Sequence, residues 1–203
     1  MEHLLTPDGY QSALSIRETE IGIKLVKDYF ERALAKELNL TRVSAPLFVK
    51  PESGLNDNLN GVERPVSFGI KEQNDKIIEI VHSLAKWKRQ ALKRYGFHSG
   101  EGLYTDMNAI RRDEDTDNIH SIFVDQWDWE KIISKEERNI ETLRTTVCKV
   151  YNALKETEHY IASQYNYIEE FLPSDISFIT SQELEDMYPD CTPKEREYKI
   201  AKL

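Results

Sequence analysis

The sequence has few cysteines, no long hydrophobic run and no leader-like start. Its only cysteines, Cys148 and Cys191, share no CxxC spacing, so it predicts neither a disulfide framework nor a zinc site, and we expect both thiols to be structural. No apolar run reaches the roughly 18 residues that cross a bilayer. Residues 1–11 lack the basic and then apolar order of a signal peptide. We therefore expect a cytoplasmic protein with no membrane partner.

Positive charge is also scarce. Lys and Arg number 27 against 36 Asp and Glu, which gives a formal net charge of −9. A surface with this balance does not suit the phosphates of nucleic acid or anionic membranes, so we expect no nucleic-acid partner. The 39% hydrophobic and 31% charged residues are ordinary for a globular protein, and the chain is long enough for one domain with a sizeable core.

Two long amphipathic helices are predicted. The first covers about residues 11–38, and its apolar positions recur at intervals of three and four. These positions are Ile23, Val26, Phe30, Leu34 and Leu38. The second carries an apolar stripe from Ile140 to Tyr165, after a Ser134–Glu137 pair with capping-box spacing. It is expected to run for about eight turns and could break near Glu158.

Strands are predicted where β-branched residues gather. Residues 40–49 read as a strand interrupted by Pro46, which cannot donate to a central ladder and belongs at an edge or a bend. Residues 51–61 are rich in turn formers and predict a loop. The remaining predicted strands form one pair at 64–71 and 75–82, a second pair at 101–111 and 119–132 around a charged loop, and a short strand at 175–180.

Three shorter helices are predicted from their terminal residues. They are a helix opened by Ser83 and closed by Gly96, and two helices that begin after Thr180 and after Thr192. No repeat, low-complexity tract or shift in composition marks a linker. The sequence therefore predicts a single α+β domain over residues 1–203, with a mostly antiparallel sheet flanked by helices.

The stretch FVDQWDWE, residues 123–130, has two tryptophans, one glutamine and three carboxylates in eight positions. Successive side chains of a strand alternate between faces. Gln126, Asp128 and Glu130 should therefore share one face, opposite Trp127 and Trp129. Taken alone, the pattern also suits a buried edge strand with polar ends. We expect the tryptophans to pack behind the strand and fix its position.

Four stretches in a consistent order carry a resemblance to a known family. They are RVSAP after the first helix, DNLNG in the loop, VHSLAKWKRQAL, and GEGLYTDMNAIRRDED before HSIFVDQWDWE. Together they resemble the ammonia-dependent asparagine synthetases, or aspartate ammonia ligases, whose catalytic domain is built like a class II aminoacyl-tRNA synthetase. The resemblance runs from Ile16 to the end of the chain, and its most specific motifs are HSLAKWKRQ and VDQWDWE.

The resemblance implies amidation of L-aspartate by ammonia at the expense of ATP. The side-chain carboxylate would be activated as a β-aspartyl adenylate with release of pyrophosphate, and attack by ammonia would leave asparagine and AMP. Mg²⁺ is expected to accompany ATP. We expect the domain to be truncated on its C-terminal side, with the magnesium ligands and the motif 3 arginine beyond residue 203, and the 203-residue chain alone to lack asparagine synthesis.

Arg111 and Glu114 are the residues that the resemblance places beside ATP. Arg111 takes the position of the motif 2 arginine, which contacts the α-phosphate and the carboxylate being activated. A guanidinium suits this role because its planar fork bonds two oxygens and stays charged. Arg112 is the alternative, because the RDED run that begins next to it resembles the motif of the aspartyl-tRNA ligases. Glu114 would lie in the loop that approaches ATP, although such acidic loops are often simply solvated.

Two further residues are implied in the chemistry. The glutamine of the family motif lies beside the reacting carboxylate, so Gln126 would donate to a developing oxyanion without adding charge. Asp57 matches a loop aspartate near the amide end of the product, where it could orient ammonium and accept its proton. Read without the resemblance, Asp57 is a turn former.

The aspartate pocket is implied at Ser83, Lys88 and Asp128. Asp128 would hold the substrate ammonium group, and Lys88 is a partner for a substrate carboxylate. His82 could serve as a base, but the simpler expectation is a hydrogen bond within the core. The other basic residues of that helix are expected to form a solvated face; they are Lys86, Arg89, Lys93 and Arg94.

Pro46 closes a segment that resembles motif 1, through which class II domains form a two-fold dimer, so we expect a homodimer there. A tRNA ligase would need an anticodon-binding region, and few residues precede the first helix. A non-catalytic fragment or regulatory relative of the same fold remains the alternative, because function depends on the site and not on the fold.

Overall fold

The computed structural model describes residues 6–57 and 59–201. Asn58, within the DNLNG motif, and residues 1–5 of the N-terminal segment lie outside this part of the chain. The chain divides into two compact units, Met1–Glu170 and Phe171–Leu203. The first unit holds both sheets and helices α1 to α3, and the second holds helices α4 and α5. A single domain over residues 1–203 stays a prediction.

The two long helices of the first unit are α1, Ile16–Leu38, and α3, Ile140–Gln164. Both predictions are confirmed, with corrected starting points. Ser15 and Glu18 form a capping box at the start of α1, so the helix begins later than residue 11. The Ser134–Glu137 hydrogen bonds are present but precede α3, which Asn139 caps. The helix continues unbroken through Glu158.

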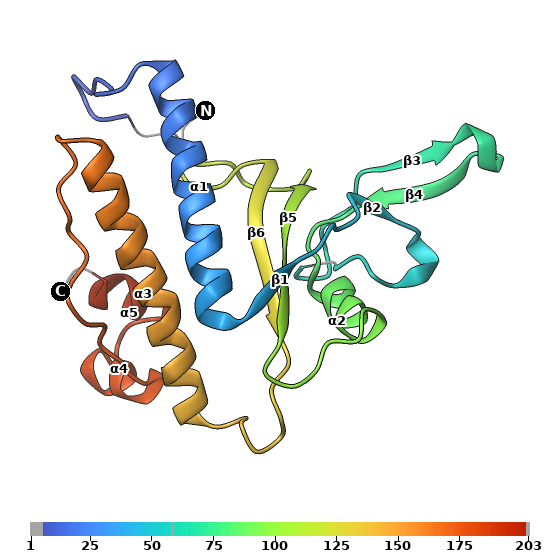
Figure 1. Cartoon of the computed structure of the whole chain (residues 1–203). Coiled ribbons are helices and arrows are strands. Elements are labelled where there is room, and N and C mark those ends of the chain that lie inside the picture. The colour runs from blue at the N-terminus through green and yellow to red at the C-terminus, as the bar shows by residue number, and fades with distance from the viewer. Residues whose placement is uncertain (1–5, 58, 202–203) are drawn as a thin grey trace. The chain divides into compact units, whose positions relative to one another are not determined.

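Within the described residues, six strands form two three-stranded sheets (Figure 1). The first has the order β1-β5-β6, and the second has the order β2-β4-β3. The strands are β1 Leu40–Arg42, β2 Phe48–Val49, β3 Ser67–Ile70, β4 Lys76–Ile80, β5 Gly102–Ile110 and β6 Phe123–Lys131. Only the β1–β5 pairing is parallel, so a mostly antiparallel arrangement is confirmed, although in two sheets. Pro46 lies where the chain leaves the first sheet for the second, the bend that its missing N–H predicted.

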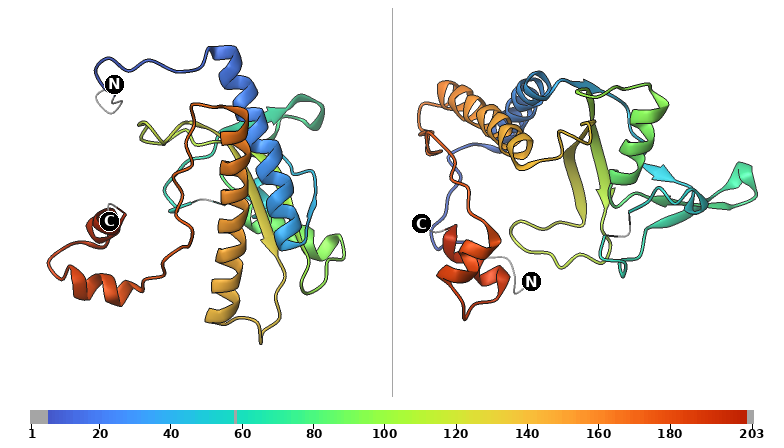
Figure 2. Two further views of the ribbon diagram at one scale, coloured as in Figure 1. Left: turned by 60° about the vertical axis from the view of Figure 1, so that its left-hand side comes forward. Right: turned by 90° about the horizontal axis from the view of Figure 1, so that it is seen from below.

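The hairpin of β5 and β6 separates two layers of helix. Helices α1 and α3 cover one face, and α2, Ala85–Arg94, covers the other (Figure 2). The α2 helix begins after Leu84, and the Ser83 hydroxyl accepts a hydrogen bond from the Ala85 amide at 3.2 Å. Short 3₁₀ helices at Pro51–Ser53 and Lys71–Gln73 complete the unit.

The core consists of two clusters, one on each face of the hairpin. On the α2 side, Trp87, Ala91 and Leu92 pack with apolar residues of β5. On the other side, Trp127 lies 5.2 Å from the ring of Phe30 and 5.5 Å from that of Tyr104. The tryptophans therefore pack behind β6, as predicted. Because large aromatics bury much area, they anchor the hairpin to α1.

Tyr104 links the same layers through a polar contact. Its hydroxyl donates to Glu31 of α1 at 2.8 Å. Burial, followed by this hydrogen bond to a carboxylate, raises the pKa of Tyr104 to about 12. Burial disfavours the charged phenolate, and the Glu31 carboxylate disfavours a second negative charge beside it. Tyr104 therefore stays a hydrogen-bond donor across the physiological pH range.

The second unit contains α4, Ser181–Met187, and α5, Pro193–Ile200. Both carry the predicted capping boxes, Thr180 with Glu183 and Thr192 with Glu195. The strand predicted at residues 175–180 is wrong, because this fully described segment has no regular secondary structure. A β-branched composition cannot supply the backbone groups of a neighbouring strand that a ladder needs.

None of the helices in the described part of the chain is both long and apolar enough to cross a membrane.

Substitution of Leu34 by alanine should destabilise the first unit. Leu34 is 3% exposed in the cluster beneath Trp127, and truncation of a buried leucine costs about 2 to 5 kcal/mol. Ile23→Ala on the same helix, where the side chain is 50% exposed, should change the free energy of unfolding by no more than about 0.5 kcal/mol. Urea unfolding followed by tryptophan fluorescence measures both. Equal effects would mean that Leu34 is not buried in this cluster as described.

Candidate active site

A row of polar side chains lies on the α2 face of the β5–β6 hairpin. Register pairs Gln126 with Met107 and Asp128 with Thr105, and both β5 partners are buried. Glu130 continues the row and reaches α2 through Lys88. The predicted alternation along residues 123–130 is therefore confirmed, because the tryptophans face α1 while the amide and carboxylates face α2.

Lys88 is the charged centre of this face. The residue is 4% exposed, and its ammonium donates to the Asp128 carboxylate and to the Trp129 carbonyl at 2.9 Å. Glu130 adds a second carboxylate 3.7 Å away. A buried ammonium is tolerated only where acceptors surround it. The sequence prediction thus brought together two residues, Lys88 and Asp128, that contact each other directly.

Two of the basic residues predicted as a solvated face make contacts. Lys86 and Arg89 are exposed residues, yet the Lys86 ammonium donates to the Asn56 carbonyl at 3.1 Å and the Arg89 guanidinium lies 3.6 Å from Glu130. Both residues are solvated, as predicted, and their charged ends are paired as well. Long side chains can lie along a surface with their charged ends paired.

The loop that carries Asp57 meets the start of α2. The Ser83 hydroxyl donates to the Asp57 carboxylate at 3.3 Å, so two more predicted site residues are in contact. Asn56, which sequence reasoning missed, is buried at 7% exposure. Its amide bonds both β4 and the segment before α2. An asparagine in a loop of turn formers carries no pattern that would have marked it, whereas the alternation with Gln126 and Asp128 could have identified Glu130.

His82 does not make the predicted core hydrogen bond. The residue is fully buried, and neither ring nitrogen has a partner among the residues that the structure describes. Only its backbone N–H is bonded, to the Asn56 side-chain oxygen at 2.9 Å. A buried polar group without a partner costs about 1 to 3 kcal/mol, so the prediction of a core hydrogen bond is wrong for the imidazole ring of His82.

The other end of the hairpin forms a polar pocket of about 450 Å³. It is lined by Leu59, Asn60, Glu63, Arg111, Asp113, Glu114 and His120. The Arg111 guanidinium lies 3.8 Å from Glu114, and its buried Nε has no partner among the described residues. Arg112 is outside the lining and more exposed. The pocket therefore favours Arg111 over Arg112 as the residue that meets a ligand.

An ion pair joins the two loops that border this pocket. The Arg64 side chain and backbone N–H both donate to Asp113, with N–H to oxygen bonds of 2.8 Å from the backbone and 3.0 Å from Nε. The hydrogen bonds from the Arg64 side chain, then that from its backbone, hold the pKa of Asp113 well below its usual range. The Arg64–Asp113 ion pair thus joins two parts of the pocket rim that are far apart in the sequence.

Gln126 lies between the Lys88–Asp128 pair and the polar pocket that contains Arg111. It is two residues from Asp128, and four from Ile122, whose carbonyl accepts the Arg111 N–H at 2.8 Å. Ile122 lies opposite Arg111, and each strand residue advances about 3.4 Å, so the backbones of Arg111 and Gln126 are about 14 Å apart along the strand. Arg111 also continues the alternation of Met107 and Ala109, which face α2. A ligand of nucleotide size could therefore contact both.

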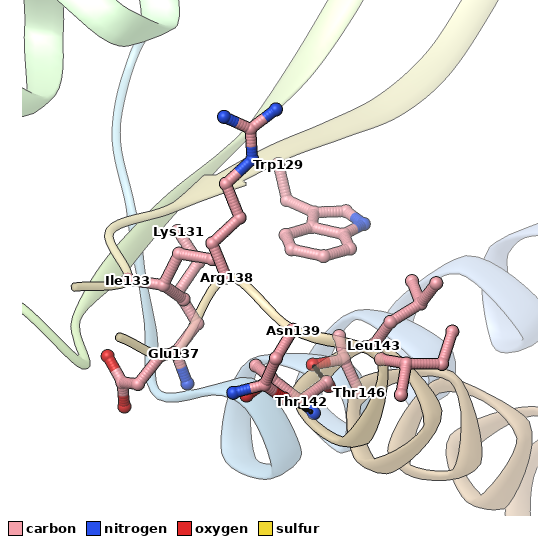
Figure 3. A pocket seen from close by; sticks show the side chains of 10 residues that line it. Trp129, Lys131, Ile133, Glu137, Arg138, Asn139, Thr142, Leu143 and Thr146 are labelled. Carbon is pink, nitrogen blue, oxygen red and sulfur yellow. Dashed lines mark hydrogen bonds between the residues drawn. The ribbon is translucent and has the colours of Figure 1, made fainter. Parts of the chain in front are cut away.

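A second pocket, of about 540 Å³, belongs to the opposite face of β6 (Figure 3). Trp129 and Lys131 line one wall, and Ile133, Leu143 and Thr146 line others. None of the predicted site residues lines it. Its position behind the strand separates it from the polar row.

No group of three or more His, Cys, Asp or Glu side chains in the described residues is placed to hold a metal ion. We assign no step to Mg²⁺.

Comparison with solved structures supports the fold. The chain aligns with the asparaginyl-tRNA synthetase of Entamoeba histolytica in complex with asparaginyl-adenylate, with a TM-score of 0.50 over 92% of this chain and 37% of that one. The sequence identity is 9%, so the likeness shows the fold alone. It confirms the predicted class II synthetase-like architecture.

Comparison of sequences identifies the family. The chain is 65% identical to an aspartate–ammonia ligase of Ruminiclostridium cellulolyticum and 68% identical to one of Clostridium perfringens, each over 202 residues and 100% of this chain. It spans 60% of the length of both relatives. The family model described as aspartate-ammonia ligase matches residues 17–203. This match, with the motifs of α2 and β6, shows that the chain belongs to the aspartate–ammonia ligase family.

Proposed function

We propose that this chain carries the aspartate-binding and adenylating residues of a ligase that makes L-asparagine from L-aspartate, ammonia and ATP. The observation that carries the proposal is the buried Lys88–Asp128 pair beside Gln126, within a chain of the aspartate–ammonia ligase family. A zwitterionic amino acid presents one ammonium and one carboxylate, and this pair offers the complementary charges in a water-poor site.

On substrate binding, the Lys88–Asp128 ion pair would be replaced by two ion pairs, one from each residue to the substrate. Asp128 would accept hydrogen bonds from the substrate ammonium, and Lys88 would donate to its α-carboxylate while keeping the Trp129 carbonyl and Glu130 as neighbours. Ser83, which precedes α2 and donates to Asp57 at 3.3 Å, would extend the aspartate site toward Asp57. Because the acceptors of Lys88 all lie on β6, the strand would hold the substrate in a fixed position beside Gln126.

Activation would take place between Gln126 and the polar pocket. A side-chain carboxylate oxygen of aspartate attacks the α-phosphorus, and the bond to pyrophosphate breaks. Arg111 would bond an α-phosphate oxygen and the attacking carboxylate together, because its fork can reach two anions at once. Glu114, 3.8 Å away, would orient that guanidinium.

Amidation would follow at the same carbonyl carbon. The ammonia nitrogen attacks it, the carbonyl oxygen takes up negative charge, and AMP leaves when the carbonyl reforms. Gln126 would donate to the oxyanion. Asp57 would orient the incoming ammonium and accept the proton whose loss gives ammonia. The nitrogen loses its second proton to solvent after the attack, as AMP leaves.

We further propose that the protein is cytoplasmic and that Mg²⁺ accompanies ATP. We also propose that the protein forms a homodimer. Leu47, Phe48 and Phe68 are exposed beside Pro46, and the two phenylalanine rings meet edge to face at 5.8 Å. Exposed apolar patches of this kind support an interface. Sedimentation equilibrium that found only monomers would oppose it.

The proposed reaction predicts AMP and pyrophosphate as products. A suitable enzyme is a hybrid in which residues 1–203 replace the matching 202 residues of the Clostridium perfringens relative, because that relative supplies the rest of the family's length. Given aspartate, ammonium and ATP, the hybrid should release AMP, pyrophosphate and asparagine in equal amounts, measured by chromatography. ADP and phosphate as products would reject the adenylate mechanism, whereas no aspartate-dependent turnover would favour a non-catalytic relative.

In the hybrid, Gln126→Leu should lower kcat by roughly a hundredfold, the usual effect of losing one oxyanion donor. The fold should persist, because the side chain is of similar size. Asp125→Asn is the matched control: it is the adjacent residue of the same strand but faces Lys27 of α1, so its kcat should stay within about twofold. Steady-state kinetics with circular dichroism distinguishes the cases, and a folded, fully active Gln126→Leu enzyme would remove Gln126 from the chemistry.

Arg111→Lys should lower kcat/KM for ATP far more than Arg112→Lys. An ammonium cannot copy a bidentate fork, and only Arg111 lines the pocket. Both substitutions keep the charge, so each serves as the control for the other. Initial rates at varied ATP concentration measure the difference, and the reverse ranking would show that Arg112 is the residue that contacts the nucleotide.

A further inference from the structure

We propose that Asn56 is a positioning residue for the amidation step, which holds Asp57 in place while leaving adenylation to other residues. The inference rests on the proposed function. Asn56 touches no group assigned to substrate, so it would act only through its neighbour in the loop.

Both the nitrogen and the oxygen of the Asn56 side-chain amide form hydrogen bonds. Its nitrogen donates to the Glu79 carboxylate at 3.1 Å and to the Ile80 carbonyl at 3.3 Å, and its oxygen accepts from the His82 N–H at 2.9 Å. The side chain therefore joins the loop both to the end of β4 and to the segment that leads into α2. A buried, fully bonded amide of this kind defines one local geometry, because loss of any partner leaves a polar group unsatisfied.

The backbone of Asn56 is held as well. The Lys86 ammonium of α2 donates to its carbonyl at 3.1 Å. Immediately after it, Asp57 receives the Ser83 hydroxyl at 3.3 Å. The Asp57 carboxylate itself has this one long hydrogen bond among the described residues, so the position of its backbone depends on the bonds of Asn56 next to it.

The groups assigned to adenylation have their own supports. Lys88 is bonded to β6, and Arg111 is paired with Glu114 in the polar pocket. Loss of Asn56 should therefore displace Asp57 more than it displaces either of them. Displacement of a reacting group by about 1 Å can cost about a hundredfold in rate.

The test separates the two half-reactions in the hybrid enzyme. Aspartate-dependent exchange of pyrophosphate into ATP, without ammonium, reports adenylation. Asparagine formation at varied ammonium reports the whole reaction. For Asn56→Leu, exchange should stay within about threefold of the unsubstituted hybrid, while asparagine formation falls at least about tenfold and the KM for ammonium rises.

Three further variants sharpen the test. Ser53→Ala removes hydrogen bonds that stay within the same loop, and it should change neither half-reaction. Asn56→Asp places a second carboxylate beside Glu79 and should behave like Asn56→Leu. Adding Glu79→Gln to Asn56→Asp reverses the donor and acceptor of the 3.1 Å bond and should recover part of the lost amidation.

The inference fails if Asn56→Leu lowers exchange and amidation equally, which indicates a general folding defect, or if it changes neither. An unsubstituted hybrid without turnover would instead reject the proposed function. Hydrogen exchange of the 203-residue chain tests the anchoring by Asn56 independently of turnover. The Ala85 amide, bonded to Ser83, should exchange about tenfold faster in Asn56→Leu, and unchanged exchange there would overturn the positioning role.

Discussion

A lysine ammonium buried between a helix and a hairpin is the interaction on which the site depends. Lys88 extends from α2, and all its acceptors belong to β6: Asp128, Glu130 and the Trp129 carbonyl. An ammonium taken from water is costly unless such acceptors compensate. These contacts therefore hold α2 against β6, and the segment before α2 brings Ser83 to the loop that carries Asp57.

The hairpin can present this polar face because its other face is anchored. Trp127 packs against Phe30 and Tyr104, so the aromatic side of β6 is fixed against α1. Strand alternation then directs Gln126, Asp128 and Glu130 to the α2 side. The same few residues serve stability on one face and chemistry on the other.

Much of this could be predicted from the chain, but unevenly. The long helices and the hairpin pairs follow from local periodicity, and their caps follow from local hydrogen bonds such as Ser15 with Glu18. Positions with a strong motif, such as Lys88 with Asp128, were also predicted as site residues. The failures share one cause. The strand expected at 175–180, the core bond expected for His82 and the role of Asn56 all depend on partners distant in sequence.

The sequence by itself determined the family, through its motifs. It also determined the order of the elements and which face each residue of 123–130 occupies, because helices repeat every 3.6 residues and strands every two. Only the tertiary structure decided that the predicted strand at 40–49 divides between two sheets. It alone also showed that Arg111 faces the polar pocket while Arg112 does not, and that Asn56 joins the loop to β4. The physical reason is that burial and hydrogen-bond partners belong to pairs of segments, and no local pattern specifies which pairs will meet.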